Sequence, residues 1–328
     1  MADLLFAINA VMPIVLTVAV GYVLKVLGIF PRELAKPMNK IVFRVLLPAM
    51  LFNNVYGIGS LGSIEPGYLL YVAVGVVAVF LISVPVSALI TKERSRRAVL
   101  IQAAFRSNYA LIGIPLAISI AGEASAAAAT ILSAVSIPVF NICAVLALSL
   151  FDPSGKRPSP LKVLRGIVTN PLVLGIAAGI AALGVRALLG HFEIDFSLYR
   201  DVAPVGKVIG YLSGAATPLA LLSLGAQFEF SALSGAKREI VWGTLMRTLI
   251  VPGVMIGISL AFPSFNAGHY AAFIGVFATP LAVSTVPMTQ EMGSDSELAG
   301  QLVLFTTLAS GVGIFLFTYL LKVIGAVG

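Results

Sequence analysis

Cysteine, histidine and acidic residues are scarce in this sequence, and the shortage excludes several kinds of chemistry. The single cysteine, Cys143, rules out an intrachain disulfide and has no neighbours that could complete a metal site. The two histidines, His191 and His269, lie far apart along the chain and belong to no metal-binding motif. No pairing of Ser with His, His with Glu or two Asp has the pattern of a catalytic site. We therefore expect no metal, no cofactor and no enzymatic activity.

Charged residues of both signs are also few. They make up 11% of the chain, while hydrophobic residues make up 59%. A soluble domain carries roughly 25% charged residues, so this chain cannot cover a soluble globule and lipid must be its main solvent. The formal net charge of +7 does not indicate nucleic acid, because the basic residues lie in short gaps between apolar stretches.

Ten apolar stretches are present, each near the ~20 residues that a membrane-spanning helix needs. Their approximate limits are 4–27, 39–59, 67–91, 97–120, 124–151, 169–190, 205–228, 239–262, 269–290 and 298–324. The sequence therefore predicts an all-α polytopic membrane protein with ten transmembrane helices. A cytoplasmic linker at 152–168, rich in Pro, Ser and basic residues, separates the halves 1–151 and 169–328. The first span follows Asp3 rather than a basic stretch, so we do not expect a cleaved signal peptide.

Lysine and arginine are concentrated in alternate gaps between these spans. The gaps after spans 1, 3 and 7 and the linker are basic, whereas the alternate gaps hold no Lys or Arg except Arg200. The gap after span 9 is acidic and does not contribute. The positive-inside rule then places both termini outside the cytoplasm.

Two of the spans are interrupted in corresponding places. Residues 105–116 read FRSNYALIGIPL and residues 277–288 read FATPLAVSTVPM, and one constant offset maps the first on the second. Interrupted helices at equivalent positions of two repeats indicate a transporter's binding site, because freed backbone groups in a bilayer must line a cavity or be buried in protein. We expect residues 109–115 and 280–287 to be non-helical and to pass close to each other near the bilayer midplane.

The two halves have related patterns. Span 1 aligns with span 6, matching Pro13 with Pro171, and span 2 aligns with span 7, matching Pro48 with Pro218. Chance is the alternative explanation, since Pro is common in membrane helices. Together with the broken spans 4 and 9, however, three pairs of spans match in the same order, which favours a repeat. Because each half has an odd number of spans, the second half must be inverted relative to the first.

Two arginines lie about three turns inside spans 4 and 8. A central arginine costs ~2.5–3.5 kcal/mol on insertion scales, so Arg106 and Arg247 are expected to face a partner, a cavity or a substrate. The alternative is that each extends to the cytoplasmic headgroups. Arg106 is the stronger candidate because it adjoins the broken segment.

Neutral polar residues accompany them in the spans. Asn108 lies where the helix is expected to unwind, and its amide can donate two hydrogen bonds to a ligand. The same argument applies to further residues in spans 9, 2 and 5: Ser284, Thr285, Asn53, Asn54 and Asn141. The alternative for all of them is a hydrogen bond between helices.

No Asp or Glu lies in the central part of spans 3, 4, 5, 8, 9 or 10. Proton and cation antiporters generally need a buried carboxylate, so an anionic cargo fits better, drawn by Arg106 and by the partial positive charge of broken-helix N-termini. His269 is the one titrating candidate near a crossover helix, and we expect it to be solvated at the outer mouth.

The broken segments also resemble a known family. The motif N-x-x-x-x-G-I-P-L of span 4, with V-P in span 9, is similar to that of the auxin efflux carrier family, which includes plant PIN-type carriers and bacterial malate-permease-like proteins. Its residues here are Asn108, Gly113, Ile114, Pro115 and Leu116, with Val286 and Pro287. The short linker is more similar to a bacterial member, which implies the inner membrane of a bacterium.

The resemblance implies two inverted five-helix repeats, with the Pro-broken helices 4 and 9 crossed and with helices 1, 2, 6 and 7 forming a scaffold. Helices 3–5 and 8–10 would form a transport domain that moves as an elevator, and the scaffold could also pair two copies of the chain as a homodimer. In the family, an Asn in the helix 4 crossover contacts the substrate carboxylate, which corresponds to Asn108. Pro280 occupies the position that matches Asn108 in the second half, so recognition by two symmetric Asn is not expected.

The sequence thus predicts a secondary transporter of small organic anions such as carboxylates. The candidate substrate-binding residues are Arg106, Asn108, Tyr109, Gly113, Pro115, Ser284, Thr285, Pro287, Asn53, Asn54 and Asn141. One alternative is a sodium-coupled symporter of the bile-acid type, with oxygen ligands from Thr279, Ser284, Thr285, Thr289 and Gln290. Another is a membrane-embedded sensor that transports nothing.

Overall fold

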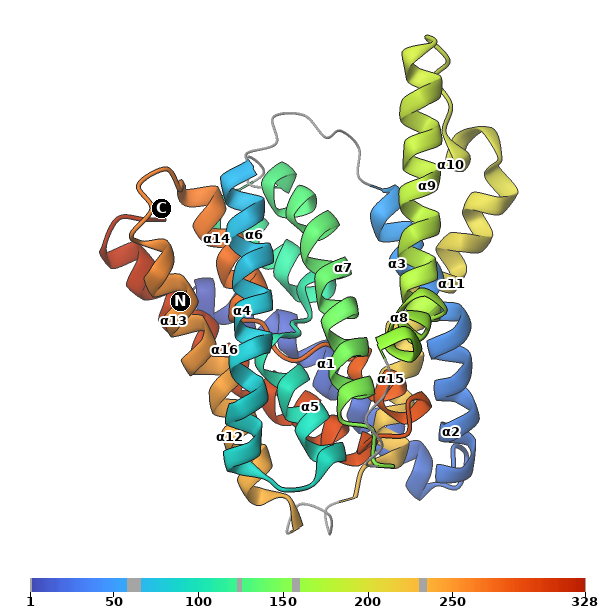
Figure 1. Cartoon of the computed structure of the whole chain (residues 1–328), viewed down its shortest axis with the longest axis vertical. Coiled ribbons are helices and arrows are strands. Elements are labelled where there is room, and N and C mark those ends of the chain that lie inside the picture. The colour runs from blue at the N-terminus through green and yellow to red at the C-terminus, as the bar shows by residue number, and fades with distance from the viewer. Residues whose placement is uncertain (1, 58–65, 123–125, 155–159, 230–234, 328) are drawn as a thin grey trace.

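The chain folds into a bundle of helices (Figure 1). The computed structural model describes residues 2–57, 66–122, 126–154, 160–229 and 235–327. Within those ranges every extended regular element is a helix, and the β-structure is one isolated bridge. The prediction of an all-α protein is confirmed.

The helices follow the order expected from the apolar spans. The first half contains α1 (Ala2–Val26), α2 (Arg32–Ile41), η1 (Val42–Leu46), α3 (Leu47–Tyr56), α4 (Pro66–Ile90), α5 (Arg94–Phe105), η2 (Tyr109–Gly113), α6 (Ile114–Ala121) and α7 (Ala126–Leu150). The second contains α8 (Pro160–Val168), α9 (Pro171–His191), α10 (Leu198–Asp201), α11 (Ala203–Gln227), α12 (Lys237–Leu245), η5 (Met246–Ile250), α13 (Val251–Ser259), α14 (Ala267–Phe277), α15 (Thr285–Glu291) and α16 (Ser296–Val323). The linker predicted at 152–168 includes α8, while residues 155–159 lie outside the described residues.

Helix lies along each of the ten spans predicted from the sequence. Six of the described helices are long and apolar enough to cross a membrane: Pro66–Ile90, Ala128–Leu150, Pro171–His191, Ala203–Gln227, Lys237–Ser259 and Ser296–Val323. The chain is therefore an integral membrane protein with several apolar helices. The count of ten crossings, the inverted repeat and the orientation stay predictions.

In the described part of the chain, three helices contain a widened, π-helical turn, and each such turn ends two residues before a proline. The turns η1, η2 and η5 are followed by Pro48, Pro115 and Pro252, each at the second position of the next α-helix. Proline lacks an N–H, and its ring collides with the carbonyl four residues earlier, which here belongs to the widened turn. The wider turn lets the helix continue past the proline, and such turns are frequent at functional sites.

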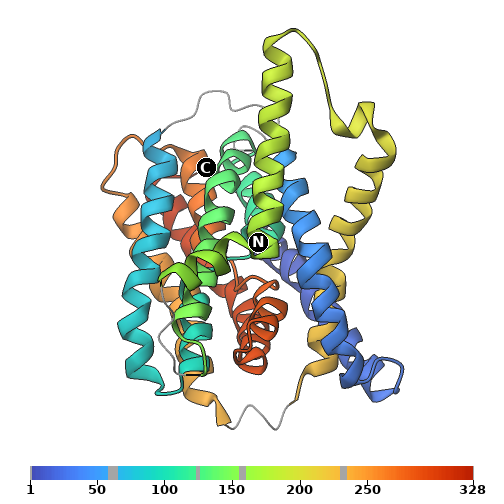
Figure 2. The ribbon, with the colours of Figure 1, turned by 45° about the vertical axis from the view of Figure 1, so that its right-hand side comes forward.

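The helices form two groups on either side of the molecule. Figures 1 and 2 both show α2, α3, α9 and α11 together on one side, and α4, α12, α13 and α14 on the other. The most extensive contacts join α1 with α11 and α3 with α9. Glycines allow these close crossings: a Cβ on Gly225 would lie 2.0 Å from the Val18 carbonyl oxygen, and one on Gly175 would lie 2.6 Å from that of Pro48.

Candidate functional site

The fourth helix breaks at residues 106–108, earlier than the sequence predicted. α5 ends at Phe105, the next three residues are not helical, and helix resumes at Tyr109. The prediction that 109–115 is non-helical is therefore wrong. Pro115 does not break the helix, because the widened turn η2 lets the helix continue past it.

The ninth helix breaks over residues 278–284, between α14 and α15. The prediction of non-helical structure at 280–287 is right as far as Ser284 and wrong for the last three residues. Pro287 lies in the first turn of α15, where a proline is tolerated because an N–H at that position has no partner within the helix.

The two broken segments cross, as predicted. Ser107 and Leu281 form an antiparallel bridge; the Asn108 N–H donates to the Pro280 carbonyl at 2.8 Å, and the Ala282 N–H donates to the Arg106 carbonyl at 3.3 Å. Each broken segment thus forms hydrogen bonds with backbone groups that lost their helical partners in the other segment. A bilayer requires such bonds, because it contains no water to replace them.

Beside this bridge the widened turn η2 and the helix α14 touch through their backbones. A Cβ on Gly113 would lie 2.7 Å from the Gly275 carbonyl oxygen, and one on Gly275 would lie 2.6 Å from that of Gly113. Only glycine fits at both positions. Gly113 therefore allows the two backbones to approach closely at the crossing. It does not line the cavity described below.

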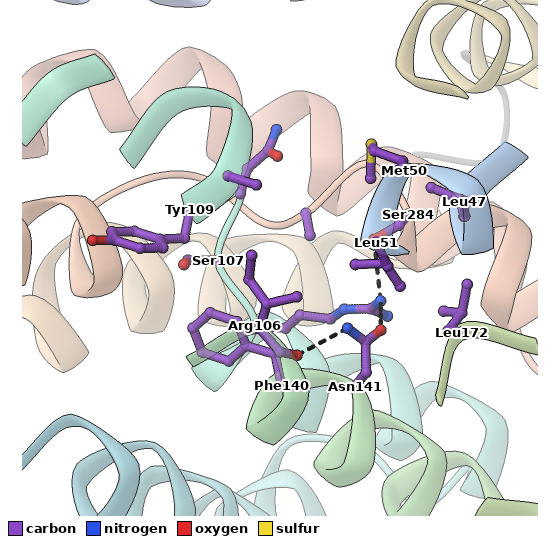
Figure 3. A pocket seen from close by; sticks show the side chains of 14 residues that line it. Leu47, Met50, Leu51, Arg106, Ser107, Tyr109, Phe140, Asn141, Leu172 and Ser284 are labelled. Carbon is purple, nitrogen blue, oxygen red and sulfur yellow. Dashed lines mark hydrogen bonds between the residues drawn. The ribbon is translucent and has the colours of Figure 1, made fainter. Parts of the chain in front are cut away.

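Arg106 lies at the crossing with its side chain turned into the protein (Figure 3). It is 2% exposed. One terminal nitrogen donates to Gln102 Oε1 at 3.0 Å and to Met288 Sδ at 3.0 Å; the other donates to Asn141 Oδ1 at 2.9 Å and to Ser284 Oγ at 3.1 Å. The side chain does not extend to the headgroups in this structure.

All of these acceptors are neutral. Among the described residues, the ion pairs involve other arginines, and none involves Arg106. Leaving a buried charge without an opposite charge is costly, since several kcal/mol of lost hydration must be recovered. An arginine in this state indicates a site where an anion can supply the missing charge.

A small cavity of about 50 Å³ opens beside Arg106. Its wall is formed by the two broken segments, by α7 and by the helices α3 and α9, through Leu47, Met50, Leu51, Arg106, Ser107, Asn108, Tyr109, Ala110, Ile137, Phe140, Asn141, Leu172, Ala282 and Ser284. The cavity thus lies between the helices α3 and α9 on one side and α7 with the crossing on the other.

Several hydrogen-bond donors at this cavity are unused. Asn108 Nδ2 and Ser107 Oγ are buried and have no hydrogen-bond partner, whereas nearly all buried polar groups in proteins have one. The helix Tyr109–Ala121 begins at the cavity, and the first N–H groups of a helix have no partner within it and carry partial positive charge. Every one of these features favours an anion.

The structure brings five of the predicted site residues to the cavity: Arg106, Asn108, Tyr109, Asn141 and Ser284. The Tyr109 ring points away, as Figure 3 shows, and its hydroxyl donates to the Ala129 carbonyl at 2.8 Å. The others do not line it: Gly113, Pro115, Thr285, Pro287, Asn53 and Asn54. Asn53 lies further along α3, where its side-chain oxygen accepts a hydrogen bond from Tyr199 at 2.7 Å.

Arg247 is also buried, with 0% exposure, but it contacts a different set of groups. Its three hydrogen bonds go to the backbone carbonyls of Thr279 at 2.7 Å, Ala104 at 3.2 Å and Val276 at 2.8 Å. It therefore stabilises the crossing and does not face the cavity.

His269 departs from its predicted environment. It is 4% exposed, its ring stacks on Tyr68 at 4.3 Å, and it forms a capping box with Asn266 at the start of α14. The prediction of a solvated histidine is wrong, because the N-terminal end of α14 is covered by aromatic rings of α4 and of the segment before α14.

Sequence reasoning missed several residues of the cavity. Ser107 could have been found, since it stands between two candidates in the polar triple Arg-Ser-Asn. Leu47, Leu51 and Leu172 left no signal, because an apolar residue in an apolar span looks the same whether it faces lipid, a neighbouring helix or a cavity.

Comparisons with known proteins agree on the class of protein. Residues 6–318 match the family described as membrane transport protein. An uncharacterized transporter of Methanothermobacter thermautotrophicus is 25% identical over 337 residues, covering 95% of this chain and 98% of that protein. A protein of Rhizobium meliloti, provisionally named a malonate transporter, is 23% identical over 218 residues, covering 66% of this chain and 64% of that protein.

Proposed function

The chain belongs to the membrane transport protein family, which includes the auxin efflux carriers, and on that premise we propose that it is a secondary carrier of small organic anions. The observation that carries the proposal is the environment of the Arg106 side chain. Its guanidinium is buried at the crossing of two broken helices, lines a cavity and has no acidic partner among the described residues. A carboxylate in the cavity would provide that partner.

The surroundings of Arg106 fit a carboxylate in detail. Asn108 Nδ2 and Ser107 Oγ are donors without partners, and the helix Tyr109–Ala121 directs its N-terminus to the same space. A carboxylate has two oxygens that accept several hydrogen bonds at once. Donors fixed before binding cost little entropy on binding, which increases affinity.

The size of the cavity favours a compact anion. A single water needs roughly 10–15 Å³ of such space, and the cavity provides about 50 Å³. The relative from Rhizobium meliloti carries the name of a malonate transporter, so short mono- and dicarboxylates are the first ligands to test.

The position of the cavity also supports an elevator movement. One wall comes from α3 and α9, which pack extensively on each other, and the opposite wall comes from the crossing and α7. Under the proposal α1, α2, α3, α9 and α11 form the fixed scaffold. The crossing would then move past it with the bound anion, which matches the two helix groups of Figure 2.

One observation favours a sodium-coupled symporter as a second candidate. Thr285 and Thr289 lie one turn apart on α15, both are fully buried, and neither hydroxyl has a hydrogen-bond partner. Unused hydroxyl oxygens are suitable ligands for a hard cation. Of the other predicted ligands, Thr279 already donates to the Gly275 carbonyl at 2.7 Å.

Thermal unfolding of the purified protein distinguishes the two. Short carboxylates, starting with malonate, acetate and malate, are added with either sodium or potassium as the only alkali cation. A ligand that binds the folded state stabilises it by RT ln(1 + [L]/Kd), which is about 2.7 kcal/mol at a hundredfold excess over Kd. The proposal predicts stabilisation by at least one carboxylate in both salts. Stabilisation in sodium alone supports the symporter, and none by any anion removes the proposed function.

A further inference from the structure

Arg247 connects the two broken helices through their backbones. It lies in the widened turn η5, and each nitrogen of its guanidinium donates to a different carbonyl: Nε to Thr279, one terminal nitrogen to Ala104 and the other to Val276. Among the described residues, no acidic side chain pairs with it. Each of its three nitrogens therefore donates to a backbone oxygen at the crossing.

These carbonyls are the ones that the two breaks leave free. Ala104 is next to last in α5, Val276 is next to last in α14, and Thr279 belongs to the segment that follows α14. The last carbonyls of a helix have no partner within the helix and carry partial negative charge. The C-terminal ends of two half-helices thus converge on one cation that the chain itself provides.

In many carriers, ends of this kind bind a coupling cation instead. Half-helix C-termini and unwound carbonyls coordinate sodium or protons near the middle of the bilayer. In this chain a fixed positive charge already fills that position, with hydrogen bonds of 2.7–3.2 Å.

We propose that Arg247 is a built-in cation, a positioning residue that replaces a coupling ion at the crossing and holds the broken helices in the geometry that binds the anion. The inference rests on the proposed transport function. Arg247 and Arg106 have separate tasks: the first neutralises helix C-termini, and the second faces the cavity. Transport by the natural chain then needs no sodium.

Three substitutions of Arg247 separate the effect of its charge from the effects of its hydrogen bonds and of its size. Arg247→Lys keeps the charge with fewer donors, Arg247→Gln keeps donors without the charge, and Arg247→Ala leaves a space that a guanidinium ion from solution can fill. We expect carboxylate affinity to fall by about tenfold more for Arg247→Gln than for Arg247→Lys, which corresponds to about 1.4 kcal/mol. Arg200→Ala is the matched control, because Arg200 is an exposed arginine on α10 with ion pairs of its own.

The decisive readout is a carboxylate affinity that depends on an added cation, which an arginine that only stabilises the fold would not produce. Low millimolar guanidinium chloride should raise the unfolding temperature and the carboxylate affinity of Arg247→Ala in a saturable way. It should leave the natural chain and Arg200→Ala unchanged. The unfolding temperature reports on the crossing even if no carboxylate binds, so failure of the transport proposal and failure of this inference are distinguishable.

Three results would overturn the inference. The first is equal carboxylate affinity in Arg247→Lys and Arg247→Gln, because hydrogen-bond donors alone would then suffice. The second is an absolute need for sodium in the natural chain. The third is an Arg247→Ala protein that guanidinium does not affect. If Arg247→Ala does not fold, the comparison of Lys with Gln decides.

Discussion

A terminal nitrogen of Arg106 lies 2.9 Å from the side-chain oxygen of Asn141, and this hydrogen bond joins the crossing to the continuous helix α7. The Asn141 amide is itself held by the Ile137 carbonyl at 2.9 Å. Asn141 therefore accepts from the arginine without neutralising it. The guanidinium is fixed in direction, and its charge remains available to a ligand.

The first prediction concerns Asn108. Replacing it with alanine removes the unpartnered Nδ2 at the cavity, and carboxylate affinity should fall by ~1–3 kcal/mol, the cost of leaving a polar group of the ligand unsatisfied. Thermal unfolding without ligand should change little. Asn53→Ala is the matched control, since Asn53 does not line the cavity. An unchanged Kd in Asn108→Ala, measured by calorimetry, would remove Asn108 from the site.

The second prediction concerns the charge of Arg106. Arg106→Lys should retain part of the carboxylate binding, because a positive charge survives without the planar fork of donors. Arg106→Gln should lose most of it. The unfolding temperature of Arg106→Gln without ligand should not fall, because the substitution removes a buried charge that has no opposite charge. Near-natural binding by both variants would show that the charge does not attract the anion.

The third prediction concerns the contact between the crossed helices. Gly113→Ala would place a Cβ 2.7 Å from the Gly275 carbonyl oxygen, so the helices must separate. Such overpacking costs ~1–3 kcal/mol, and the unfolding temperature and the carboxylate affinity should both fall. Gly253→Ala is the control, because its Cβ would meet nothing closer than a Phe317 ring carbon at 3.7 Å. Equal stability of the two variants would disprove the close contact.

The sequence predicted the helices better than the details of the site. Apolar runs of about twenty residues have few alternatives to a helix in a bilayer, and the described helices follow them. The polar residues Arg106, Asn108, Asn141 and Ser284 were recognisable because any polar group is conspicuous in such a run, and the structure brings these four together at the cavity.

The break points could not be read from prolines. The widened turn η2 carries the helix past Pro115, and Pro287 lies in the first turn of α15, where the missing N–H costs nothing. Each break therefore falls some residues before its proline. The hydrogen-bond partners of Arg247 could not be predicted either, because they are backbone carbonyls. Every residue has a backbone carbonyl, so no sequence pattern indicates which of them accept a hydrogen bond.

The central claim, that the chain is a secondary carrier of small organic anions, is tested most directly by malonate flux in proteoliposomes. Potassium and valinomycin clamp the membrane potential, and sodium and pH are kept equal on both sides. Each net negative charge moved is worth ~2.3 kcal/mol per 100 mV, so we predict flux that follows the voltage, with inside-negative potential favouring export. Flux that ignores the voltage and appears only with a sodium or pH gradient would contradict the account.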